Sequence, residues 1–316
     1  MISQDNGFQE VVGIVADAQA SAHLLCEALG YAELHRGEVP NGALTLWQPK
    51  ASTAAREVLV GHPNSPRGQI RLVEFATAPG ARMRDGAQAW DPGGIFDINV
   101  RSLTGIDRLH GALGLAGFLS PAPITDWQFG PLSVREVVEN NADGLAIALM
   151  ERVSPPLTGY ESLTGPASWV FNSTQIVPDF ASARALYVDA LGWDIVQESD
   201  LLHEDGRNCM GLPLGLAPNI KAKVGIYQAH GRMEGSVEII AFDFAGIDFS
   251  AAAPPDRGWA SLRFPLSDAA AFLAKAKAGG CEVSVLAEFD WAPHGRVRAG
   301  SVRTPWGARL DIFELI

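Results

Sequence analysis

Two stretches of the chain repeat the same order of hydrophobic and polar positions. Residues 11–31 (VVGIVADAQASAHLLCEALGY) and 172–193 (NSTQIVPDFASARALYVDALGW) each begin as a strand pattern, pass an aspartate and end on Ala-Leu-Gly-aromatic. After the aspartate, apolar residues recur at i, i+3 and i+4, which predicts a helix with one buried face. The aspartate suits the N-cap of that helix, and the glycine 13 residues later suits its C-terminal end.

Other segments show the same correspondence between the two halves of the chain. They are residues 67–75 with 234–242, 96–117 with 260–280, 125–134 with 289–302, and 142–153 with 305–316. The second pair reads as a strand followed by a helix, and the later segments alternate in the manner of half-buried strands. The chain therefore reads as four βαβββ units.

A segment rich in turn-forming residues divides these units into two pairs. Residues 153–168 read VSPPLTGYESLTGPAS. Such composition is typical of a boundary between domains. We therefore expect residues 1–155 to hold the first two units and residues 156–316 the last two. Apolar residues make up 47% of the chain and charged residues 19%, which is enough for real hydrophobic cores.

Charge and composition narrow the class of protein. The net charge of −12 argues against nucleic acid or an anionic membrane as partner, because both need a basic surface. The three cysteines are far apart and show neither a disulfide framework nor zinc spacing. The sequence shows no secretion signal and no apolar run of roughly 20 residues, so we expect a cytoplasmic protein. A small-molecule ligand is the expected partner, and a homodimer is a candidate assembly.

These features resemble the vicinal oxygen chelate superfamily, which includes glyoxalase I, bleomycin-resistance proteins and type I extradiol dioxygenases. The strand–Asp–helix–Leu-Gly-aromatic signature at 11–31 and 172–193 and the fourfold repeat carry the resemblance across essentially the whole chain. It implies an α+β fold in which two βαβββ units pair and curl a mixed sheet into a cup, with helices outside. Two cups per chain resembles the extradiol dioxygenases in particular.

The resemblance also implies a divalent metal, held by the first and last strands of paired units. Its first-strand ligand lies about seven residues before the helix-starting aspartate, which indicates Glu10 in unit one. In unit two the corresponding position, 13 residues before Gly117, is Thr104, and the same count from it indicates Asp97. The last strand of unit one offers Glu74. These carboxylates would suit Mg²⁺ or Mn²⁺, with iron as a further candidate. The alternative is that they are carboxylates at strand ends, exposed to solvent. No first-strand position carries histidine, whereas extradiol cleavage in this family uses two histidines and a glutamate.

The same count in the C-terminal half indicates Asn172 in unit three and Ser261 in unit four, with Asp311 on the last strand of unit four. The last strand of unit three offers Ala241 or Glu238 instead. Because side chains alternate between the two faces of a strand, residues 260–266 are expected to direct Ser261 and Arg263 into the cup.

A buried arginine needs a partner, so Arg263 would either pair with Asp311 or bind a ligand oxygen. We expect the C-terminal cup to be the working site, with Asn172 and Asp311 orienting polar atoms of the substrate.

The hexapeptide DWAPHG at 290–295 adds an indole and an imidazole to this cup. Its Asp-Trp pair recurs at 126–127, so Trp291 is either a hairpin packing residue or a lid over a ligand. His294 has no counterpart in the earlier hairpin. A histidine at the rim can move protons near neutral pH, although an isolated loop histidine is often only solvated.

Three functions remain open on the sequence. The first is a vicinal-oxygen-chelate-type lyase, isomerase or ring-modifying enzyme that acts on a small oxygenated, apolar or aromatic metabolite. The second is a metal-free protein that sequesters a small molecule, as bleomycin-resistance proteins do. The third is a metal-dependent extradiol-type dioxygenase whose ligands lie a few residues from the positions counted above.

Overall fold

A computed structural model of the chain describes residues 4–47, 54–65, 67–129, 131–230 and 234–316. The elements of units one and two follow the predicted order. Unit one comprises β1 (Glu10–Ile14), α1 (Ala18–Leu29), β2 (Ala32–Glu38), an added α2 (Asn41–Trp47), β3 (Ala55–Gly61) and β4 (Gln69–Phe75). Unit two comprises β5 (Asp97–Ser102), α3 (Ile106–Leu115), β6 (Thr125–Phe129), β7 (Leu132–Asn140) and β8 (Ala146–Ser154).

Units three and four repeat that order. Unit three comprises β9 (Ala167–Ile176), α4 (Phe180–Arg184) continued by a π-helical turn (Ala185–Ala190), β10 (Asp194–Leu201), a 3₁₀ turn (Ala217–Asn219), β11 (Ala222–Gln228) and β12 (Ser236–Phe242). Unit four comprises β13 (Gly258–Pro265), α5 (Ala269–Ala278), β14 (Glu282–Val283), β15 (Ala287–Trp291), β16 (Gly295–Arg303) and β17 (Arg309–Leu315). The predicted α+β fold of four βαβββ units is confirmed.

The predicted helix boundaries follow from local capping. The Asp17 and Asp179 side chains accept hydrogen bonds from the backbone N–H groups of Ala20 and Ser182. Gly30 ends α1 in the left-handed region at φ 71°, where a residue without Cβ meets no steric penalty. The repeated Asp and Gly positions therefore mark where the helices begin and end.

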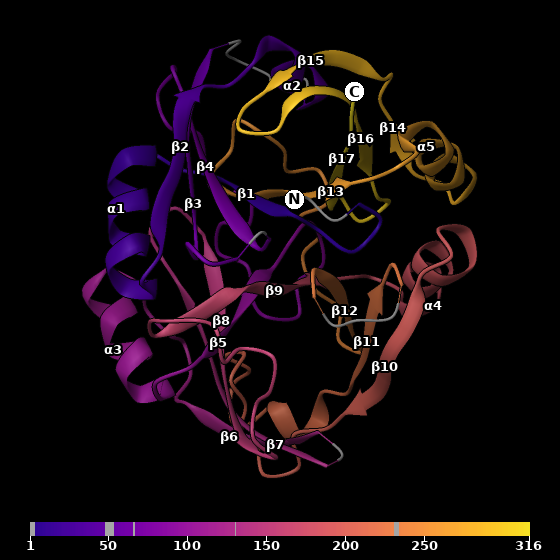
Figure 1. The fold of residues 1–316 in the computed structure, drawn as a ribbon. Helices are drawn as coiled ribbons and strands as arrows, with labels where there is room; N and C mark the ends of the chain where they lie inside the picture. Colours follow the sequence, from indigo (N-terminus) through magenta and orange to yellow (C-terminus); the bar gives the residue numbers. More distant parts are fainter. Residues whose placement is uncertain (1–3, 48–53, 66, 130, 231–233) are drawn as a thin grey trace.

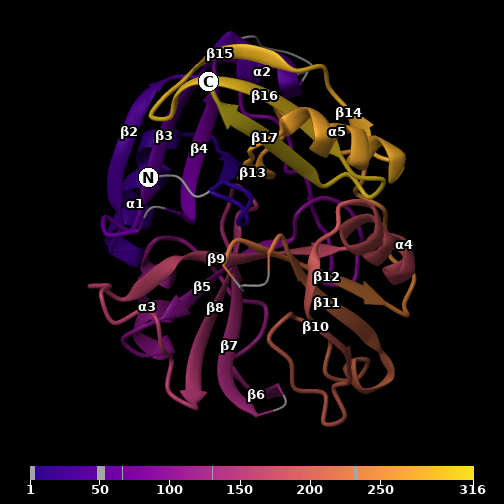
Figure 2. The ribbon, with the colours of Figure 1, turned by 45° about the vertical axis from the view of Figure 1, so that its right-hand side comes forward.

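The strands form two curled mixed sheets, but the units pair differently from the prediction. Over the described residues, the first sheet runs β14-β16-β17-β13-β1-β4-β3-β2, with β15 on β16, and the second runs β10-β11-β12-β9-β5-β8-β7-β6. Units one and four thus build one cup, here called cup one, and units two and three build cup two. Figures 1 and 2 show cup one in indigo and yellow above cup two in magenta and orange.

The expected pairing of neighbouring units, and with it a cup made by residues 156–316 alone, is therefore wrong. Residues 155 and 156 lie between β8 and β9, which belong to the same sheet. The antiparallel pairs β1–β13 and β5–β9 join the units at the centre of each cup. Which units pair depends on contacts between the side chains of these central strands. The sequence repeats alone do not reveal those contacts.

The helices cover the outside of both sheets. Helices α1 and α3 lie side by side on one flank, and α4 and α5 lie on the other (Figure 1). Buried residues from all four units form one large hydrophobic cluster between the helices and the sheets. The concave faces carry smaller hydrophobic clusters together with buried polar groups. Within the described residues, none of the helices has the length and apolar character needed to cross a membrane.

Candidate functional site

Glu10, on β1, lies at the centre of cup one and is completely buried. It accepts hydrogen bonds from Arg71 Nε at 2.8 Å and Nη2 at 2.9 Å, and from Arg263 Nη1 at 3.0 Å. His294 Nε2 lies 2.6 Å from Glu10 Oε1, the oxygen that also accepts from Arg71 Nη2. Burial by itself raises the pKa of Glu10, but Arg71 and His294 outweigh it and hold this pKa well below its usual range.

Further acidic groups complete this buried cluster. Arg71 Nη1 donates to Glu57 at 2.5 Å, and Arg263 Nε lies 3.9 Å from Asp311 Oδ2. The two arginines and three carboxylates of this cluster lie side by side, although Arg263 Nε and Nη2 and Asp311 Oδ1 have no hydrogen-bond partner among the described residues. Cup one is therefore occupied by buried groups of opposite charge.

Apolar and hydroxyl side chains close the remaining space in cup one. The Arg263 guanidinium lies 4.0 Å from the ring centroid of Trp291, which is 0% exposed. Asp311 accepts hydrogen bonds from Trp47 Nε1 at 2.8 Å and Ser261 Oγ at 2.6 Å. The structure thus brings together Ser261, Arg263, Trp291, His294 and Asp311, as the sequence predicted. Of the two alternatives for Arg263, the structure shows an ion pair with Asp311 and adds a shorter one with Glu10 that the sequence did not indicate. Trp291 lies in the core instead of at an open rim.

Asn172 does not join them. It lies on β9 in cup two, because unit three pairs with unit two. The expected working site, which combined Asn172 with Asp311, is therefore divided between the two cups.

The three carboxylates predicted to hold a metal are also separated. Glu10 lies in cup one and Asp97 in cup two. Glu74 accepts from the backbone N–H of Ala18 at 3.0 Å and from Arg56. Among the residues with described positions, no group of three or more His, Cys, Asp or Glu side chains is arranged to hold a metal ion.

The position of Glu74 recurs with the same role in other units. Glu151 accepts from the N–H of Ile106 at 3.1 Å, and Glu314 accepts from the N–H of Ala269 at 2.9 Å. In each case a last-strand glutamate satisfies the first turn of the helix in its own unit, where N–H groups lack partners. The last-strand glutamates at this position therefore serve to accept hydrogen bonds from the helix N-termini.

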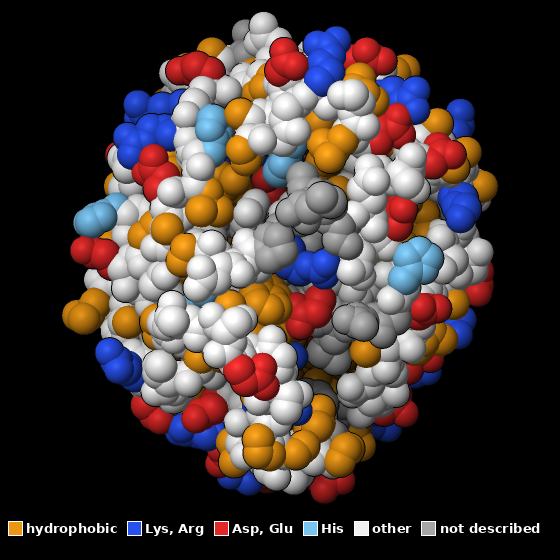
Figure 3. Space-filling model, viewed as in Figure 1, with side chains coloured by type: hydrophobic (Ala, Val, Ile, Leu, Met, Phe, Trp, Pro, Cys, Tyr) orange, Lys and Arg blue, Asp and Glu red, His pale blue; other side chains and the backbone are white. Residues whose placement is uncertain are grey.

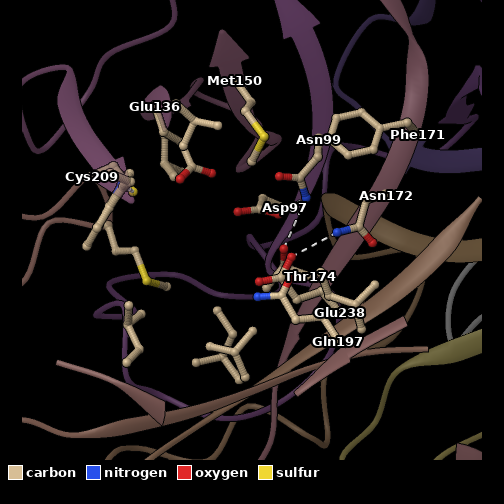
Figure 4. A pocket seen from close by; sticks show the side chains of 18 of the residues that line it. Asp97, Asn99, Glu136, Met150, Phe171, Asn172, Thr174, Gln197, Cys209 and Glu238 are labelled. Atoms are coloured by element: carbon tan, nitrogen blue, oxygen red, sulfur yellow. Dashed lines mark hydrogen bonds between the residues drawn. The ribbon is translucent and has the colours of Figure 1, made fainter. Parts of the chain in front are cut away.

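Cup two, in contrast, is hollow. Its concave face encloses a cavity of about 90 Å³, enough for several water molecules. The lining residues come from β5 to β12: Asp97, Asn99, Arg101, Trp127, Leu132, Val134, Glu136, Val138, Met150, Arg152, Phe171, Asn172, Thr174, Gln197, Leu201, Cys209, Met210, Val224, Ile226, Glu238 and Ile240. Figure 4 shows labelled acids, amides and sulfur groups facing a common space.

Hydrogen bonds order the polar side of this cavity. Asn99 Nδ2 donates to Asp97 Oδ1 at 3.2 Å and to Thr174 Oγ1 at 3.1 Å. Asn172 Nδ2 donates to Glu238 Oε2 at 2.8 Å (Figure 4). These contacts link β5, β9 and β12, so the central strands of both units contribute.

Asn99 was missed by counting along the sequence. It stands directly opposite Asn172 in the antiparallel β5–β9 pair, so the two asparagines are equivalent across the cup. The count of seven residues started at Thr104 and reached Asp97. Helix α3 has Gly105 at its N-cap with no side-chain cap, so the aspartate that marks the helix start elsewhere is absent.

Glu136 was also missed, although the sequence carries a signal for it. It lies between Val134 and Val138, which face the same side of β7 because strand side chains alternate. An acidic residue between two inward valines indicates a carboxyl inside the cup.

The cavity acids hold their protons unusually strongly. Burial raises the pKa of Asp97 to about 6. Burial and the negative charge of Asp97 raise the pKa of Glu136 to about 7. Burial, Glu136 and Asp97 together raise the pKa of Glu238 to about 8, although the hydrogen bond from Asn172 opposes this rise. Their raised pKa values lie close to neutral pH.

The cavity residues do not fit the divalent metal that the fold resemblance implied. Asn172 turns its amide nitrogen toward Glu238, while its Oδ1 accepts from Ser173 N and Ser236 Oγ. Met150, a thioether, lies on the last strand of unit two. Asp97, Glu136 and Glu238 also line the cavity, but within the described part of the chain they form no group of three arranged to hold a metal ion. An amide whose oxygen is already occupied and a thioether are poor donors for Mg²⁺, Mn²⁺ or Fe²⁺.

Arginines lie at another end of the cavity. Arg101 and Arg152 line it, and both also line an outer groove together with Tyr160 and Trp169. Arg101 Nε donates to Tyr160 Oη at 3.1 Å, and its guanidinium lies 3.9 Å from the ring centroid of Phe171. These residues therefore form the mouth between the cavity and the surface. Acidic and basic side chains are interspersed over the face drawn in Figure 3.

Comparison with known proteins gives a match to structures alone. No family model and no curated protein sequence matches the chain. Glyoxalase I from Zea mays superposes with a TM-score of 0.65 at 13% identity, covering 98% of this chain and 92% of that one. A proposed dioxygenase from Bacillus subtilis gives a TM-score of 0.59 at 12% identity, covering 99% and 86%.

Identities this low establish the fold and leave the activity open. The similarity nevertheless extends over nearly the full length, with all four units included. The resemblance seen in the sequence is confirmed at the level of the fold, which the chain shares with glyoxalase I.

Proposed function

We propose that the protein is a vicinal-oxygen-chelate-type enzyme, a lyase or isomerase, that moves a proton on a small oxygenated molecule bound in cup two. One observation carries this proposal. Glu238 lines the cavity, is held by Asn172 at 2.8 Å, and has its pKa raised to about 8 by burial and by the neighbouring acids. A carboxyl whose pKa lies near the working pH is suited to take up and return a proton.

The neighbouring acids give the cavity a second role. Glu136, with its pKa raised to about 7, keeps its proton part of the time at neutral pH and then donates a hydrogen bond to a substrate oxygen. Val134, Val138 and Ile240 form apolar walls that bind the rest of a small apolar or aromatic substrate. We therefore assign proton transfer to Glu238 and oxygen binding to Glu136.

The test is turnover of defined substrate classes by purified protein. Hemithioacetals and catechols probe isomerisation and ring cleavage, and Glu238→Gln removes the proton carrier while keeping its size. We expect Glu238→Gln to lower kcat at least about 100-fold. In the wild-type enzyme, kcat should follow a group with an apparent pKa near 8. Unchanged kcat in Glu238→Gln would refute the assignment.

The sequence also proposed His294 as proton carrier, with Arg263 and Trp291 binding substrate. That alternative predicts the opposite ranking, because His294 lies against Glu10 in cup one. It requires His294→Ala to abolish turnover while Glu238→Gln retains it. Assaying the two variants side by side separates the two assignments.

Sequestration without chemistry is the second candidate function. It is favoured by the donor set of cup two, which does not fit a metal ion, since a binding protein has no need of one. In that case ligands raise the melting temperature of the protein and are recovered unchanged. Extradiol-type cleavage has less support, because no histidine lines the cavity among the residues whose positions the structure describes.

A further inference from the structure

We propose that Trp127 sets the length of the substrate in cup two: the oxygen atoms of the ligand lie at the acids of the cavity, and its apolar part extends toward the indole ring and ends there. This assignment rests on the proposed function, since it takes the same cavity and the same class of ligand. It adds the orientation of the ligand and a residue that determines specificity.

Trp127, on β6, forms part of the wall between the cavity and a second groove on the surface. Its side chain lines both the cavity and the second groove, which it shares with Asp126, His203 and Arg207. The indole N–H donates to Cys209 Sγ at 3.3 Å. The ring centroid lies 5.2 Å from that of His203, which is 2% exposed. The ring is therefore held in place at a boundary of the cavity.

The loop that carries Cys209 is fixed by a single buried asparagine. Asn208 Nδ2 donates to the carbonyl oxygens of Gly206 and Leu212 at 3.1 and 2.9 Å. Its Oδ1 accepts from the N–H groups of Met210 and Leu212 at 3.1 and 2.8 Å. The amide thus uses both of its donors and accepts two hydrogen bonds. The loop presents Cys209 and Met210 to the cavity in a defined arrangement, which in turn supports the indole.

Apolar side chains of the cavity gather around Trp127. Met210, Val224 and Ile240 belong to one buried cluster, and Trp127 packs against that cluster. Val134 stands opposite Trp127 in the β6–β7 pair and also lines the cavity. Burial of apolar surface therefore favours an apolar chain at this boundary.

The mouth of the cavity carries charged side chains instead. Arg101 and Arg152 line it, and Arg101 is only 5% exposed. An apolar chain that leaves the cavity there has to cover guanidinium groups, whose charge is costly to remove from water. The apolar part of the ligand is therefore directed away from the arginines and toward Trp127.

The corresponding tryptophan of cup one has a covering role. Trp291 occupies the same place in the repeated Asp-Trp pair, is 0% exposed, and lies with its ring centroid 4.0 Å from the Arg263 guanidinium. Trp127 faces a cavity at that place. A bound ligand therefore takes the position under the ring that Arg263 holds in cup one.

Calorimetric titration of the whole protein with 4-n-alkylcatechols of increasing chain length tests the proposal. The catechol oxygens provide the polar end and the alkyl chain the apolar end. Each buried methylene raises affinity roughly fourfold, so affinity for the wild type should rise with chain length and then fall once the chain reaches the ring. In Trp127→Ala the maximum should move to a longer chain, and 4-hexylcatechol should bind at least about tenfold more tightly than to the wild type.

Two further variants accompany this measurement. Trp127→Leu keeps part of the apolar bulk and should move the maximum in the same direction by a smaller amount. Phe244→Ala removes a ring that packs on Trp90 and does not line the cavity, so it is the matched control and should leave the maximum in place. Circular dichroism of each variant checks that it is folded.

A maximum that stays at the same chain length in both Trp127 variants overturns the proposal. So does a shift of the maximum in Trp169→Ala instead, which would place the chain at the mouth, and so does a lack of binding of the whole series. Turnover that depends on Glu238, with an unmoved maximum, leaves the proposed function standing and removes the role of Trp127. A maximum that moves as expected, without turnover of any substrate class, does the reverse.

Discussion

Cup one and cup two are built from the same βαβββ units, yet their concave faces have opposite character. In cup one, Glu10 is surrounded by Arg71, Arg263 and His294. In cup two, Glu136 and Glu238 face a cavity, and no basic side chain among the described residues contributes to the pKa shift of either carboxyl. The pKa of Glu10 is accordingly lowered, while the pKa values of the acids in cup two are raised.

This difference indicates that the concave face of a curled sheet can serve as a packed core or as a binding site. Which of the two it is depends on whether its buried carboxylates are paired with basic side chains. Buried carboxylates cost free energy when they leave water, and paired arginines offset that cost. In cup one, arginines of the chain offset the free-energy cost of burying the carboxylates. In cup two, that cost is offset by protonation of the acids or by a bound ligand, which is the arrangement expected of a binding site.

The largest expected effect comes from breaking the charge balance of cup one. Glu10→Ala leaves Arg71 and Arg263 buried with too few partners and should lower the free energy of unfolding by about 3–5 kcal/mol. Urea titration of wild type and variant measures this loss. Glu33→Gln, which alters an exposed ion pair, should change stability by less than about 1 kcal/mol. A loss in Glu10→Ala no larger than in this control would contradict the comparison.

The stability contributed by the two cups should depend on pH in opposite directions: that of cup two should fall as pH rises, and that of cup one as pH falls. The folded-state pKa values of Asp97, Glu136 and Glu238 are raised, so the stability linked to them is full below about pH 4 and declines as pH rises through 6 to 8. The folded-state pKa of Glu10 is lowered, so its contribution is present above about pH 4.5 and is lost as the solution becomes more acidic.

We therefore expect maximal stability near pH 5, with a decrease of several kcal/mol by pH 8.5. The free energy of unfolding, measured in urea across this range, checks the shape of the curve. Stability that rises steadily up to pH 8.5 would show that the acids of cup two are compensated after all.

An intermediate effect is expected for Glu238→Gln, and its sign is opposite to that of Glu10→Ala. At pH 8.5 the substitution removes a buried negative charge and should stabilise the fold by about 1–2 kcal/mol. At pH 5 the wild-type carboxyl is protonated, so the two proteins should melt at similar temperatures. Calorimetry at both pH values measures the difference, and destabilisation at pH 8.5 would be the opposing result.

The smallest effect should be common to both cups. Glu74 and Glu151 accept hydrogen bonds from the first turns of α1 and α3, in cup one and cup two respectively. Replacing either by glutamine removes a negative charge from a helix N-terminus and should cost about 0.5–1 kcal/mol. Thermal melts of both variants check this. A much larger loss for one than for the other would argue that the position differs between the cups.

The site was predicted in part. The inward positions of Ser261 and Arg263 followed from alternation along a single strand, and Asp311 was one of two candidate partners for Arg263. The shorter ion pair of Arg263, with Glu10, joins two strands that the sequence did not pair. Asn99 was not identified, because its unit lacks the capping aspartate that sets the register elsewhere. Its equivalence to Asn172 is visible only across the paired strands.

The order of the four units, the helix boundaries and the fold class were determined by the sequence alone. These depend on local periodicity and on caps such as Asp17 and Asp179, whose contacts lie within a few residues. The tertiary structure alone decided which units pair, and hence that His294 lies in a filled cup and Glu238 in a hollow one. Which units pair depends on contacts between residues far apart in the sequence, such as Glu10 with Arg263. Because the repeated units have the same pattern of strands, that pattern does not distinguish one pairing from another.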